Sequence, residues 1–335
     1  MNDLMPRDAL ARPLRDLRLS LIDACNFRCP YCMPADRIAE DHGLDAASRL
    51  SFDEIETLVR GFARLGVRKL RLTGGEPLLR KGLPALVARL AAIEGIEDLA
   101  LTTNGSLLAR HAPALRDAGL QRITVSLDTL GAEVFRALSG GRGELGDVLA
   151  GIDAAHAAGF APVKLNCVVQ RGVNDAGIEQ LAGYAREHGH VLRFIEYMDV
   201  GTCNGWSRER VVPSAELRDR IAARWPLRAL DANYRGEVAD RYAYEDGAGE
   251  VGFVSSVTAP FCGDCHRARV SADGRLYTCL FAASGHDLRP LLASGEDTVA
   301  AHVAAVWARR SDRYSEIRSE AGASRKHVEM FLVGG

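Results

Sequence analysis

The sequence lacks several features that would assign a function class directly. No apolar run approaches the roughly 20 residues that a membrane-spanning helix needs, and the N-terminal segment MNDLMPRDALARPLRDLR has no apolar core typical of a secretory signal peptide. A GxxxxGK[ST] phosphate-binding loop is also absent. The formal net charge is −2, so the chain as a whole does not attract polyanions. These absences predict a cytoplasmic protein that binds neither membranes nor nucleic acid and is no P-loop enzyme.

The eight cysteines are distributed unevenly, and their spacing is the most informative pattern in the chain. One trio follows an early strand-like run, a second lies near the C-terminal end, and two cysteines stand alone. Three closely spaced thiolates suit an iron–sulfur cluster, because soft sulfur ligands hold iron and zinc. Three ligands on a four-iron cluster would leave one iron open to a substrate. The trios are Cys25-x3-Cys29-x2-Cys32 and Cys262-x2-Cys265-x13-Cys279, and the single residues are Cys167 and Cys203.

Two alternatives to iron–sulfur clusters remain for these cysteines. A structural zinc site takes four protein ligands, and neither trio supplies four locally. Disulfides need an oxidising compartment, which the missing signal peptide argues against. Cys167 lies in the strand-like run VKLNCVV and is predicted to be a buried structural thiol.

The first two-thirds of the chain alternates strand-like and helical patterns. Ser51-Phe52-Asp53-Glu54 is typical of a helix start, because the serine and glutamate can cap each other's backbone. Six strands that alternate with helices predict a parallel sheet with right-handed crossovers. Polar motifs follow the strands, which favours a partial (βα)6 TIM-like barrel over a flat doubly wound sheet. The predicted strands span residues 15–22, 67–73, 97–103, 122–128, 163–170 and 191–197, and the predicted helices span 52–65, 82–93, 107–118, 146–158 and 176–188.

The pattern changes after about residue 230. Residues 234–257 carry short alternating runs with turn signals, which predict hairpins. The second cysteine trio follows, and helical segments continue to about residue 320. At 335 residues, the chain is long enough for one large domain and a smaller one. We expect a barrel domain over residues 1–230 and a smaller C-terminal α+β domain over residues 231–335.

Small and polar residues stand where the predicted strands end. Examples are Thr73-Gly74-Gly75-Glu76-Pro77, Thr102-Thr103-Asn104-Gly105 and Ser126-Leu127-Asp128. Paired glycines allow the backbone to approach a ligand closely. Arg71 and Lys164 lie within predicted strands, and a buried cation needs an anionic partner. Because the guanidinium fork suits phosphate oxygens, these positions predict a site for a phosphorylated ligand.

Seven segments together resemble a known family. RLSLIDACNFRCPYCMP and KLRLTGGEPLLR resemble the radical S-adenosylmethionine superfamily. With LTTNG, ITVSLDT, EYMDVG, FCGDCHRARVSADGRLYTCLF and the terminal Gly334-Gly335, the pattern is similar to the GTP 3′,8-cyclase family of molybdenum cofactor biosynthesis. The likeness runs in order from about residue 15 to residue 335. Ala24 and His266 depart from the family pattern, which has arginine and asparagine there, but neither departure removes a family ligand.

The resemblance implies two cofactors and a set of site residues. Each cysteine trio would hold a [4Fe-4S] cluster, and the open iron of the first would bind S-adenosylmethionine. Arg18, Gly334 and Gly335 are implied to be catalytic, with the double-glycine tail entering the barrel mouth. Tyr31, Gly75, Ser126 and Met198 match positions that contact S-adenosylmethionine. Positions that contact GTP are matched by Arg18, Arg71, Thr102, Lys164, Arg267, Ala268 and Arg269.

The resemblance also implies a reaction and partners. The enzyme would be a lyase that forms (8S)-3′,8-cyclo-7,8-dihydroguanosine 5′-triphosphate from GTP. A 5′-deoxyadenosyl radical would abstract the 3′ hydrogen of GTP, and C3′ would then attack C8. The implied partners are an electron donor such as flavodoxin or ferredoxin, a downstream cyclic pyranopterin monophosphate synthase and a second copy of the chain.

Two rival interpretations remain open at this point. Another two-cluster radical enzyme, such as a peptide-modifying maturase, would share the first trio, but it tends to carry more C-terminal cysteines and has no need of Arg267-x-Arg269. An electron carrier or a zinc-stabilised binding protein would have no use for Gly74-Gly75-Glu76-Pro77 or for cations suited to phosphate.

Overall fold

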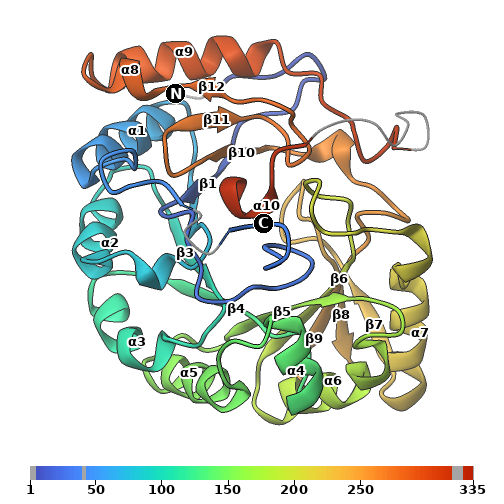
Figure 1. Ribbon diagram of the computed structural model, residues 1–335. Helices are drawn as coiled ribbons and strands as arrows, with labels where there is room; N and C mark the ends of the chain where they lie inside the picture. Colours follow the sequence, from blue (N-terminus) through green and yellow to red (C-terminus); the bar gives the residue numbers. More distant parts are fainter. Residues whose placement is uncertain (1–4, 40–42, 319–326, 335) are drawn as a thin grey trace.

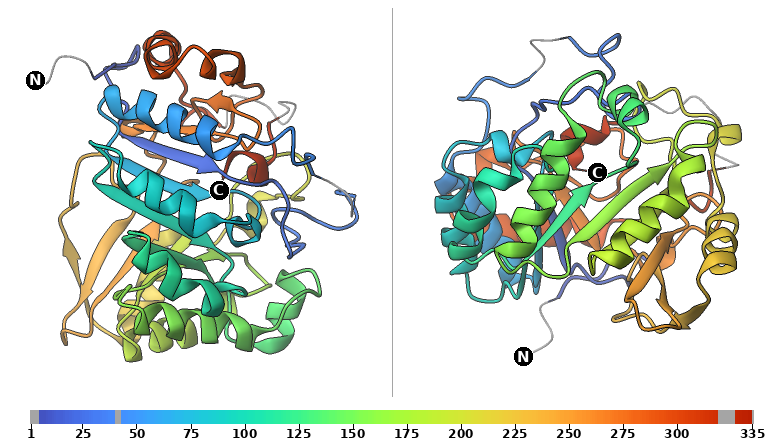
Figure 2. Two further views of the ribbon diagram at one scale, coloured as in Figure 1. Left: turned by 90° about the vertical axis from the view of Figure 1, so that its left-hand side faces the viewer. Right: turned by 90° about the horizontal axis from the view of Figure 1, so that it is seen from below.

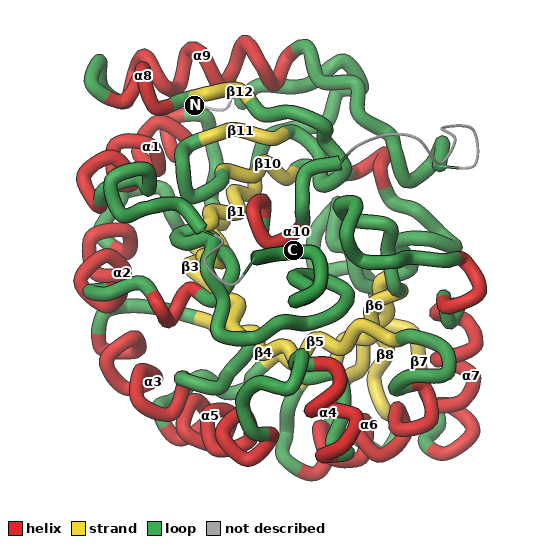
Figure 3. The backbone as a smooth tube through the Cα atoms, in the orientation of Figure 1, coloured by secondary structure: helices red, strands yellow, loops and turns green. Residues whose placement is uncertain are grey.

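The fold is a curved sheet wrapped by helices on its outer face. The computed structural model describes residues 5–39, 43–318 and 327–334. Eight strands run parallel in the order β10-β1-β2-β3-β4-β5-β6-β9, with antiparallel strands at both edges. Figures 1 and 3 show the strands as an inner ring with the helices outside it, and Figure 2 shows the same layering from two further sides. The expected partial barrel is confirmed.

The six predicted strands and five predicted helices all form, with ends shifted by a few residues. Ser51 and Glu54 cap the first helix reciprocally, as the sequence indicates. The strands are β1 (Asp16–Ser20), β2 (Lys69–Thr73), β3 (Asp98–Thr103), β4 (Arg122–Ser126), β5 (Lys164–Val169), β6 (Val191–Glu196), β7 (Leu227–Leu230), β8 (Asp240–Tyr244), β9 (Glu250–Val254), β10 (Arg267–Val270), β11 (Arg275–Tyr277) and β12 (His286–Asp287). The helices are α1 (Phe52–Arg64), α2 (Leu83–Ala91), α3 (Leu108–Asp117), α4 (Ala132–Leu138), α5 (Leu145–Ala157), α6 (Ile178–Glu187), α7 (Ser214–Arg224), α8 (Arg289–Leu292), α9 (Glu296–Ala308) and α10 (Met330–Val333).

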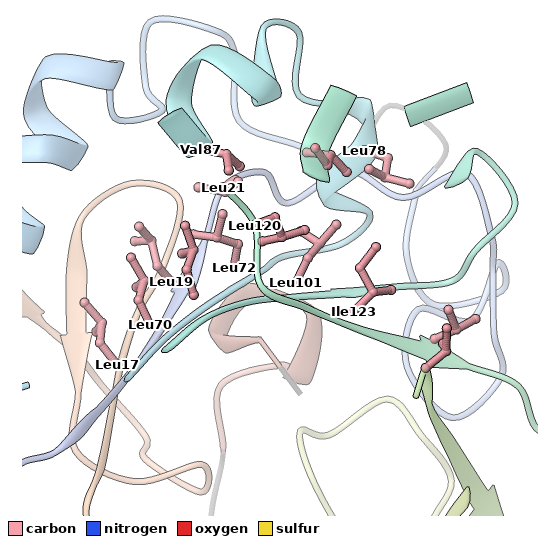
Figure 4. Close-up of a cluster of buried hydrophobic side chains, with 14 of the residues drawn as sticks. Leu17, Leu19, Leu21, Leu70, Leu72, Leu78, Val87, Leu101, Leu120 and Ile123 are labelled. Atoms are coloured by element: carbon pink, nitrogen blue, oxygen red, sulfur yellow. The ribbon is translucent and has the colours of Figure 1, made fainter. Parts of the chain in front are cut away.

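Alternation along the strands separates an apolar outer face from a polar inner face. On β1, Leu17 and Leu19 are buried in the main core, whereas Arg18 between them points the other way. Figure 4 shows Leu17 and Leu19 beside Leu70, Leu72 and Leu101 of the neighbouring strands, with Val87 of α2 above them. This core fixes the register of the strands, because a slip by one residue would move every leucine to the inner face.

The C-terminal third of the chain adds to both edges of the same sheet. The hairpin expected within residues 234–257 forms as β8 and β9, and β9 pairs in parallel with β6. At the other edge, β10 pairs in parallel with β1. Local periodicity predicted neither pairing, because it carries no information about which distant strands meet. Among the described residues, no helix combines the length and the apolar character that a membrane span requires.

A buried charge cluster joins the N-terminal segment to the C-terminal region. Asp8 Oδ2 accepts from Arg12 Nε at 2.6 Å and from Arg310 Nη1 at 2.9 Å, and all three side chains are almost fully buried. Arg12 also donates to the carbonyl of Cys262 at 2.7 Å, and Arg310 donates to that of Cys265 at 2.8 Å. The cluster therefore fixes the loop that carries the second cysteine trio.

Removal of the Asp8 charge should destabilise the fold. The change Asp8→Asn leaves two buried guanidinium groups without their carboxylate, which should lower the free energy of unfolding by about 3 kcal/mol. Denaturant titration of the anaerobic protein measures this change. The matched control is Asp297→Asn, since Asp297 pairs with Arg64 on the exposed surface and should matter little. Equal midpoints for both variants would contradict the role of the buried cluster.

Candidate active site

The inner face of the barrel carries an unusual concentration of positive charge. Arg18 on β1 lies in register with Arg71 on β2 and with Arg269 on β10. Lys164 on β5 and Arg193 on β6 belong to the same inner face, on the opposite wall. The alternation of the strands places these side chains together, because each comes from the polar face of its strand.

Burial and mutual repulsion lower the pKa values of these cations. The pKa of Arg18 falls well below its usual value because of burial and then because Arg269 and Arg71 are close. Burial, followed by neighbouring arginines, likewise lowers the pKa of Arg71 to about 10 and that of Arg269 to about 10. Lys164 is affected most visibly, since burial and the nearby Arg193 lower its pKa to about 7.

Few anions balance this charge. Arg71 donates to the hydroxyls of Thr102 at 3.0 Å and Thr124 at 3.3 Å. Arg193 lies 3.8 Å from Glu237. Within the described part of the chain, the side chains of Arg18 and Lys164 make neither an ion pair nor a hydrogen bond. Because buried cations are normally paired, this face is suited to a ligand that carries several negative charges.

The second cysteine trio opens into the same cavity as the arginines of the inner face, whereas Lys164 does not line this cavity. The cavity has a volume of about 210 Å³, and its walls include Cys262, Cys265 and Cys279 together with Arg18, Arg71 and Arg269. Met198 and Met330 line it as well. A metal group on these three thiolates would therefore face the bound anion directly.

The environment of Cys265 favours its thiolate form. Burial alone would raise the pKa of this thiol, but the nearby Arg267 and Arg310 outweigh burial and lower it to about 6. Arg267 Nη2 lies 3.5 Å from Cys265 Sγ. In contrast, burial raises the pKa of Cys279 to about 12. Metal binding would remove the thiol proton in each case.

The first cysteine trio lies in the loop that follows β1. Burial raises the pKa of Cys29 well above its usual value, and the adjacent Cys32 and Cys25 raise it further. The three thiols therefore lie close enough for their negative charges to repel one another. Deprotonation of all three would require a positively charged group between them.

Two glycines let the next strand end reach this loop. The amide of Gly75 donates to the carbonyl of Ile22 at 2.7 Å. A Cβ atom at Gly74 would lie 2.2 Å from the Ile22 carbonyl oxygen, and one at Gly75 would lie 2.2 Å from that of Ala24. No larger residue fits at either position without a backbone shift, which explains the paired glycines.

Glu76 supports the site from behind and leaves no oxygen for a ligand. Its buried carboxylate accepts from the amides of Leu78 at 3.0 Å and Asn104 at 2.8 Å and from the hydroxyl of Thr103 at 2.8 Å. Burial raises its pKa to about 7. The carboxylate joins the turn after β2 to the turn after β3, and Asn104 Nδ2 in turn lies 3.9 Å from Cys25 Sγ.

The remaining residues predicted to contact S-adenosylmethionine surround the first trio or the cavity. The Tyr31 hydroxyl donates to Asp128 at 2.7 Å, and Asp128 also accepts from the amide of Val168, which fixes the cysteine loop over β4 and β5. Ser126 ends β4, and Met198 follows β6. Ala268 differs from the other predicted contacts. Ala268 is fully buried in the main core and does not line the cavity.

The C-terminal tail lies in the mouth of the barrel. Figure 1 shows α10 inside the ring of strands. The carbonyls of Val333 and Gly334 accept from Arg269, and Gly334 has a φ of +68°. A Cβ atom at Gly334 would lie 2.2 Å from Thr73 Cγ2, so glycine is needed there. Gly335 lies outside the described residues.

The donor chemistry fits thiolate-bound clusters better than a mononuclear metal ion. Within residues 5–39, 43–318 and 327–334, no three His, Cys, Asp or Glu side chains are placed to ligate a single metal ion. A multi-iron cluster instead takes one thiolate per iron and so accepts more widely separated sulfur atoms. Each trio supplies three soft thiolate donors, and those of the second trio line the cavity. Both trios therefore fit an iron–sulfur cluster.

Comparison with protein families agrees with this donor set. Residues 19–185 match the radical SAM superfamily, and residues 190–316 match the family Molybdenum Cofactor Synthesis C. A protein named GTP 3′,8-cyclase from Xanthomonas campestris pv. campestris (strain 8004) is 68% identical over 329 residues, which is 98% of this chain and 97% of that protein. One of the same name from Acidothermus cellulolyticus is 54% identical over 357 residues, 98% of this chain and 99% of that protein.

Solved structures confirm the fold alone. Streptococcus suis SuiB superposes with a TM-score of 0.59 and 16% sequence identity, and the match covers 92% of this chain and 69% of that chain. SuiB bound to S-adenosylmethionine gives the same TM-score at 13% identity, with 96% and 76% covered.

Lys164 predicts a pH dependence for anion binding. A bound polyphosphate should raise the lowered pKa of Lys164 again, so binding above about pH 7 should take up a proton. The affinity for inorganic triphosphate should therefore fall between about pH 7 and about pH 9. Calorimetry in buffers of different ionisation enthalpy measures the uptake.

The control variants separate Lys164 from the ligand's own titration. Lys164→Met should lose the part of the proton uptake that this lysine contributes, whereas Lys81→Met, on the exposed surface, should keep it. The same uptake in all three proteins would remove Lys164 from the anion site.

Proposed function

The chain belongs to the GTP 3′,8-cyclase family of radical S-adenosylmethionine enzymes, and we propose from this that it converts GTP to (8S)-3′,8-cyclo-7,8-dihydroguanosine 5′-triphosphate. The product begins molybdenum cofactor biosynthesis. The observation that carries the proposal is the single cavity in which Cys262, Cys265 and Cys279 face Arg18, Arg71 and Arg269. A nucleoside triphosphate there would meet the cations with its phosphates and a metal group with its base. The identities of 54% and 68% along nearly the whole chain favour this family over a peptide-modifying maturase.

The cysteines would hold the two cofactors of the reaction. Cys25, Cys29 and Cys32 would bind the first [4Fe-4S] cluster, and the second trio would bind the other. When bound, the first cluster with S-adenosylmethionine supplies the 5′-deoxyadenosyl radical that removes the 3′ hydrogen of GTP before C3′ attacks C8.

The cations of the inner face would bind and orient the substrate. We assign the triphosphate to Arg18, Arg71, Lys164, Arg267 and Arg269, because guanidinium groups bind phosphate oxygens through paired hydrogen bonds. Thr102 contacts Arg71 and would fix the direction of its guanidinium group. Ala268, with its side chain in the core, would contribute backbone only.

Four residues would orient S-adenosylmethionine beside the first trio. Tyr31 is held by Asp128, and Gly75 brings bare backbone against the cysteine loop. Ser126 stands at the end of β4, and Met198 reaches the cavity from the turn after β6. Of the four, Met198 lines the cavity that the second trio also lines, so the cosubstrate would meet GTP on that side of the site.

The tail would exclude water and complete the site. A primary carbon radical needs an enclosed space, and α10 fills the barrel mouth with Phe331 and Val333 almost fully buried. We assign catalytic roles to Arg18, Gly334 and Gly335, since the bare backbone of the glycines leaves room close to the reacting atoms.

The assignment extends to partners and domains. An electron donor such as flavodoxin or ferredoxin would reduce the first cluster, a cyclic pyranopterin monophosphate synthase would use the product, and two chains would form a homodimer in the cytoplasm. We retain the division into residues 1–230 and 231–335 as a division of roles, with the S-adenosylmethionine site in the first part and the second cluster in the other.

A turnover experiment tests the proposed function. Anaerobic protein with reconstituted clusters is incubated with GTP, S-adenosylmethionine and dithionite, and the products are identified by mass spectrometry. We expect a cyclised isomer of GTP with 5′-deoxyadenosine and methionine. Omission of GTP controls for uncoupled cleavage. Cleavage of S-adenosylmethionine with no cyclised nucleotide would reject the proposal.

Replacement of one cysteine in each trio should separate the two cofactor sites. Cys29→Ser should lose the iron of the first cluster and all cleavage of S-adenosylmethionine, because the cluster loses one of three ligands. Cys265→Ser should keep binding of S-adenosylmethionine and lose cyclisation. Iron and sulfide analysis with the turnover assay checks both. Cys167→Ala, at a buried cysteine outside both trios, is the control. Full iron content in Cys29→Ser would contradict the assignment.

Deletion of Gly334 and Gly335 should impair catalysis more than binding. The truncated protein keeps α10 and the charged cavity, so iron content and GTP affinity should stay nearly unchanged while cyclisation falls severely. Turnover at matched iron content and GTP binding by calorimetry measure the two effects. Wild-type turnover in the truncated protein would show that the two glycines have no catalytic role.

A further inference from the structure

The tail is anchored to the barrel before it reaches the mouth. His327 Nδ1 lies 2.7 Å from the carbonyl of Phe281, and the amide of Val328 donates to the carbonyl of Ala282 at 2.9 Å. These contacts fix where the tail enters. They do not determine the direction of the tail beyond residue 328, and α10 begins only at Met330.

The next residue, Glu329, binds a turn on the opposite side of the tail. Its carboxylate accepts from the amide of Thr202 at 2.9 Å and from the Thr202 hydroxyl at 2.6 Å. The thiol of Cys203 donates to the second oxygen at 2.9 Å. Three donors from two consecutive residues therefore converge on one carboxylate. The hydrogen bonds are strong because the acceptor is charged.

The turn is shaped for this carboxylate. Gly201 has a φ of +77°, and a Cβ atom on it would lie 2.2 Å from Glu329 Oε2. The backbone conformation therefore favours glycine, and a side chain there would displace the Glu329 carboxylate. We define Gly201, Thr202 and Cys203 as the carboxylate-binding turn.

The carboxylate-binding turn lies beside the first cysteine loop. Cys203 Sγ is 3.8 Å from the carbonyl oxygen of Cys32. Asn204, the residue after the turn, donates to the carbonyl of Met198 at 2.9 Å. One carboxylate thus connects the tail with the segment that carries Met198 and with the loop that carries the first trio.

We propose that Glu329 is a positioning residue, which sets the place and direction of α10 and so holds Gly334 in the barrel mouth. The short helix transmits the constraint, because its backbone is hydrogen bonded and Phe331 and Val333 are buried against the barrel. At the far end of the helix, Arg269 donates to the carbonyls of Val333 and Gly334. This inference rests on the proposed function, in which the tail is catalytic.

The first test compares turnover in two variants that remove opposite sides of the interaction. Glu329→Ala removes the acceptor, and Thr202→Val removes one donor while it keeps the shape of the turn. Cyclisation should fall roughly tenfold in Glu329→Ala, which corresponds to loss of one or two charged hydrogen bonds, and less in Thr202→Val. Iron content and GTP affinity should stay unchanged. Cleavage of S-adenosylmethionine should persist, so the ratio of 5′-deoxyadenosine to cyclised product should rise.

A matched control comes from the other end of the barrel. Asp246 also binds a turn amide, that of Ala248 at 3.1 Å, but it lies in the turn that enters β9 at the amino-terminal end of the strands. Asp246→Asn should change neither turnover nor the product ratio. A similar loss in this variant would indicate a general effect of charge removal and would overturn the proposal.

The second test asks whether Glu329 acts only through the tail. In protein that already lacks Gly334 and Gly335, Glu329→Ala should cause no further loss of cyclisation. An additional loss equal to that in the full chain would overturn the proposal, because Glu329 would then act by another route.

Hydrogen exchange gives a measurement that does not depend on turnover. Exchange of the Met330–Val333 amides should be about tenfold faster in Glu329→Ala, because helix protection follows from docking. Unchanged protection would reject the proposal even if turnover fell. Failure of the wild-type protein to cyclise GTP would instead reject the proposed function, and the exchange experiment would still decide whether Glu329 docks the tail.

Discussion

Uncompensated positive charge inside the barrel is the constraint on which the rest of the structure depends. Arg18, Arg71 and Arg269 lie in register on three adjacent strands, and burial and mutual repulsion lower their pKa values. An isolated protein gains nothing from this arrangement, since buried cations without an anionic partner are costly. The outer apolar core must offset that cost, which it does through leucines that alternate with the arginines on the same strands. Stability and substrate binding are therefore divided between the two faces of one sheet.

The buried carboxylates of the structure hold loops in place, whereas the cations of the inner face are available to bind a ligand. Glu76 connects the turn after β2 to the turn after β3. Asp8 fixes the loop of the second trio through Arg12 and Arg310. Glu196, at the end of β6, accepts from the amides of Ser214, Val257 and Thr258, each at 2.8 Å. Because these acids are fully engaged, the inner face keeps its positive charge.

The barrel and the two cysteine trios can be predicted from the sequence because both leave local signals. The strands alternate, the helices have apolar faces, and the trios have characteristic spacing, so each is visible within a short window. The pairing of β9 with β6 and of β10 with β1 left no such signal, because strands of any origin can add to a sheet edge. Glu76 was noticed as a carboxylate near the site, yet its supporting role depends on the distant Asn104. Glu329 was missed for the same reason, since its partners lie more than a hundred positions away in the chain.

The pairing of β1 with β10 has a consequence for synthesis of the protein. Strand β1 (Asp16–Ser20) leaves the ribosome long before its neighbour β10 (Arg267–Val270) has been made. Until then one edge of the sheet, next to the loop of the first trio, presents unpaired amides and carbonyls, which invite association with other chains. Such long-range closure is slow compared with local helix formation. Until β10 has been made, the first cysteine loop therefore lies outside a finished barrel, and its thiols lack the enclosure of the completed fold.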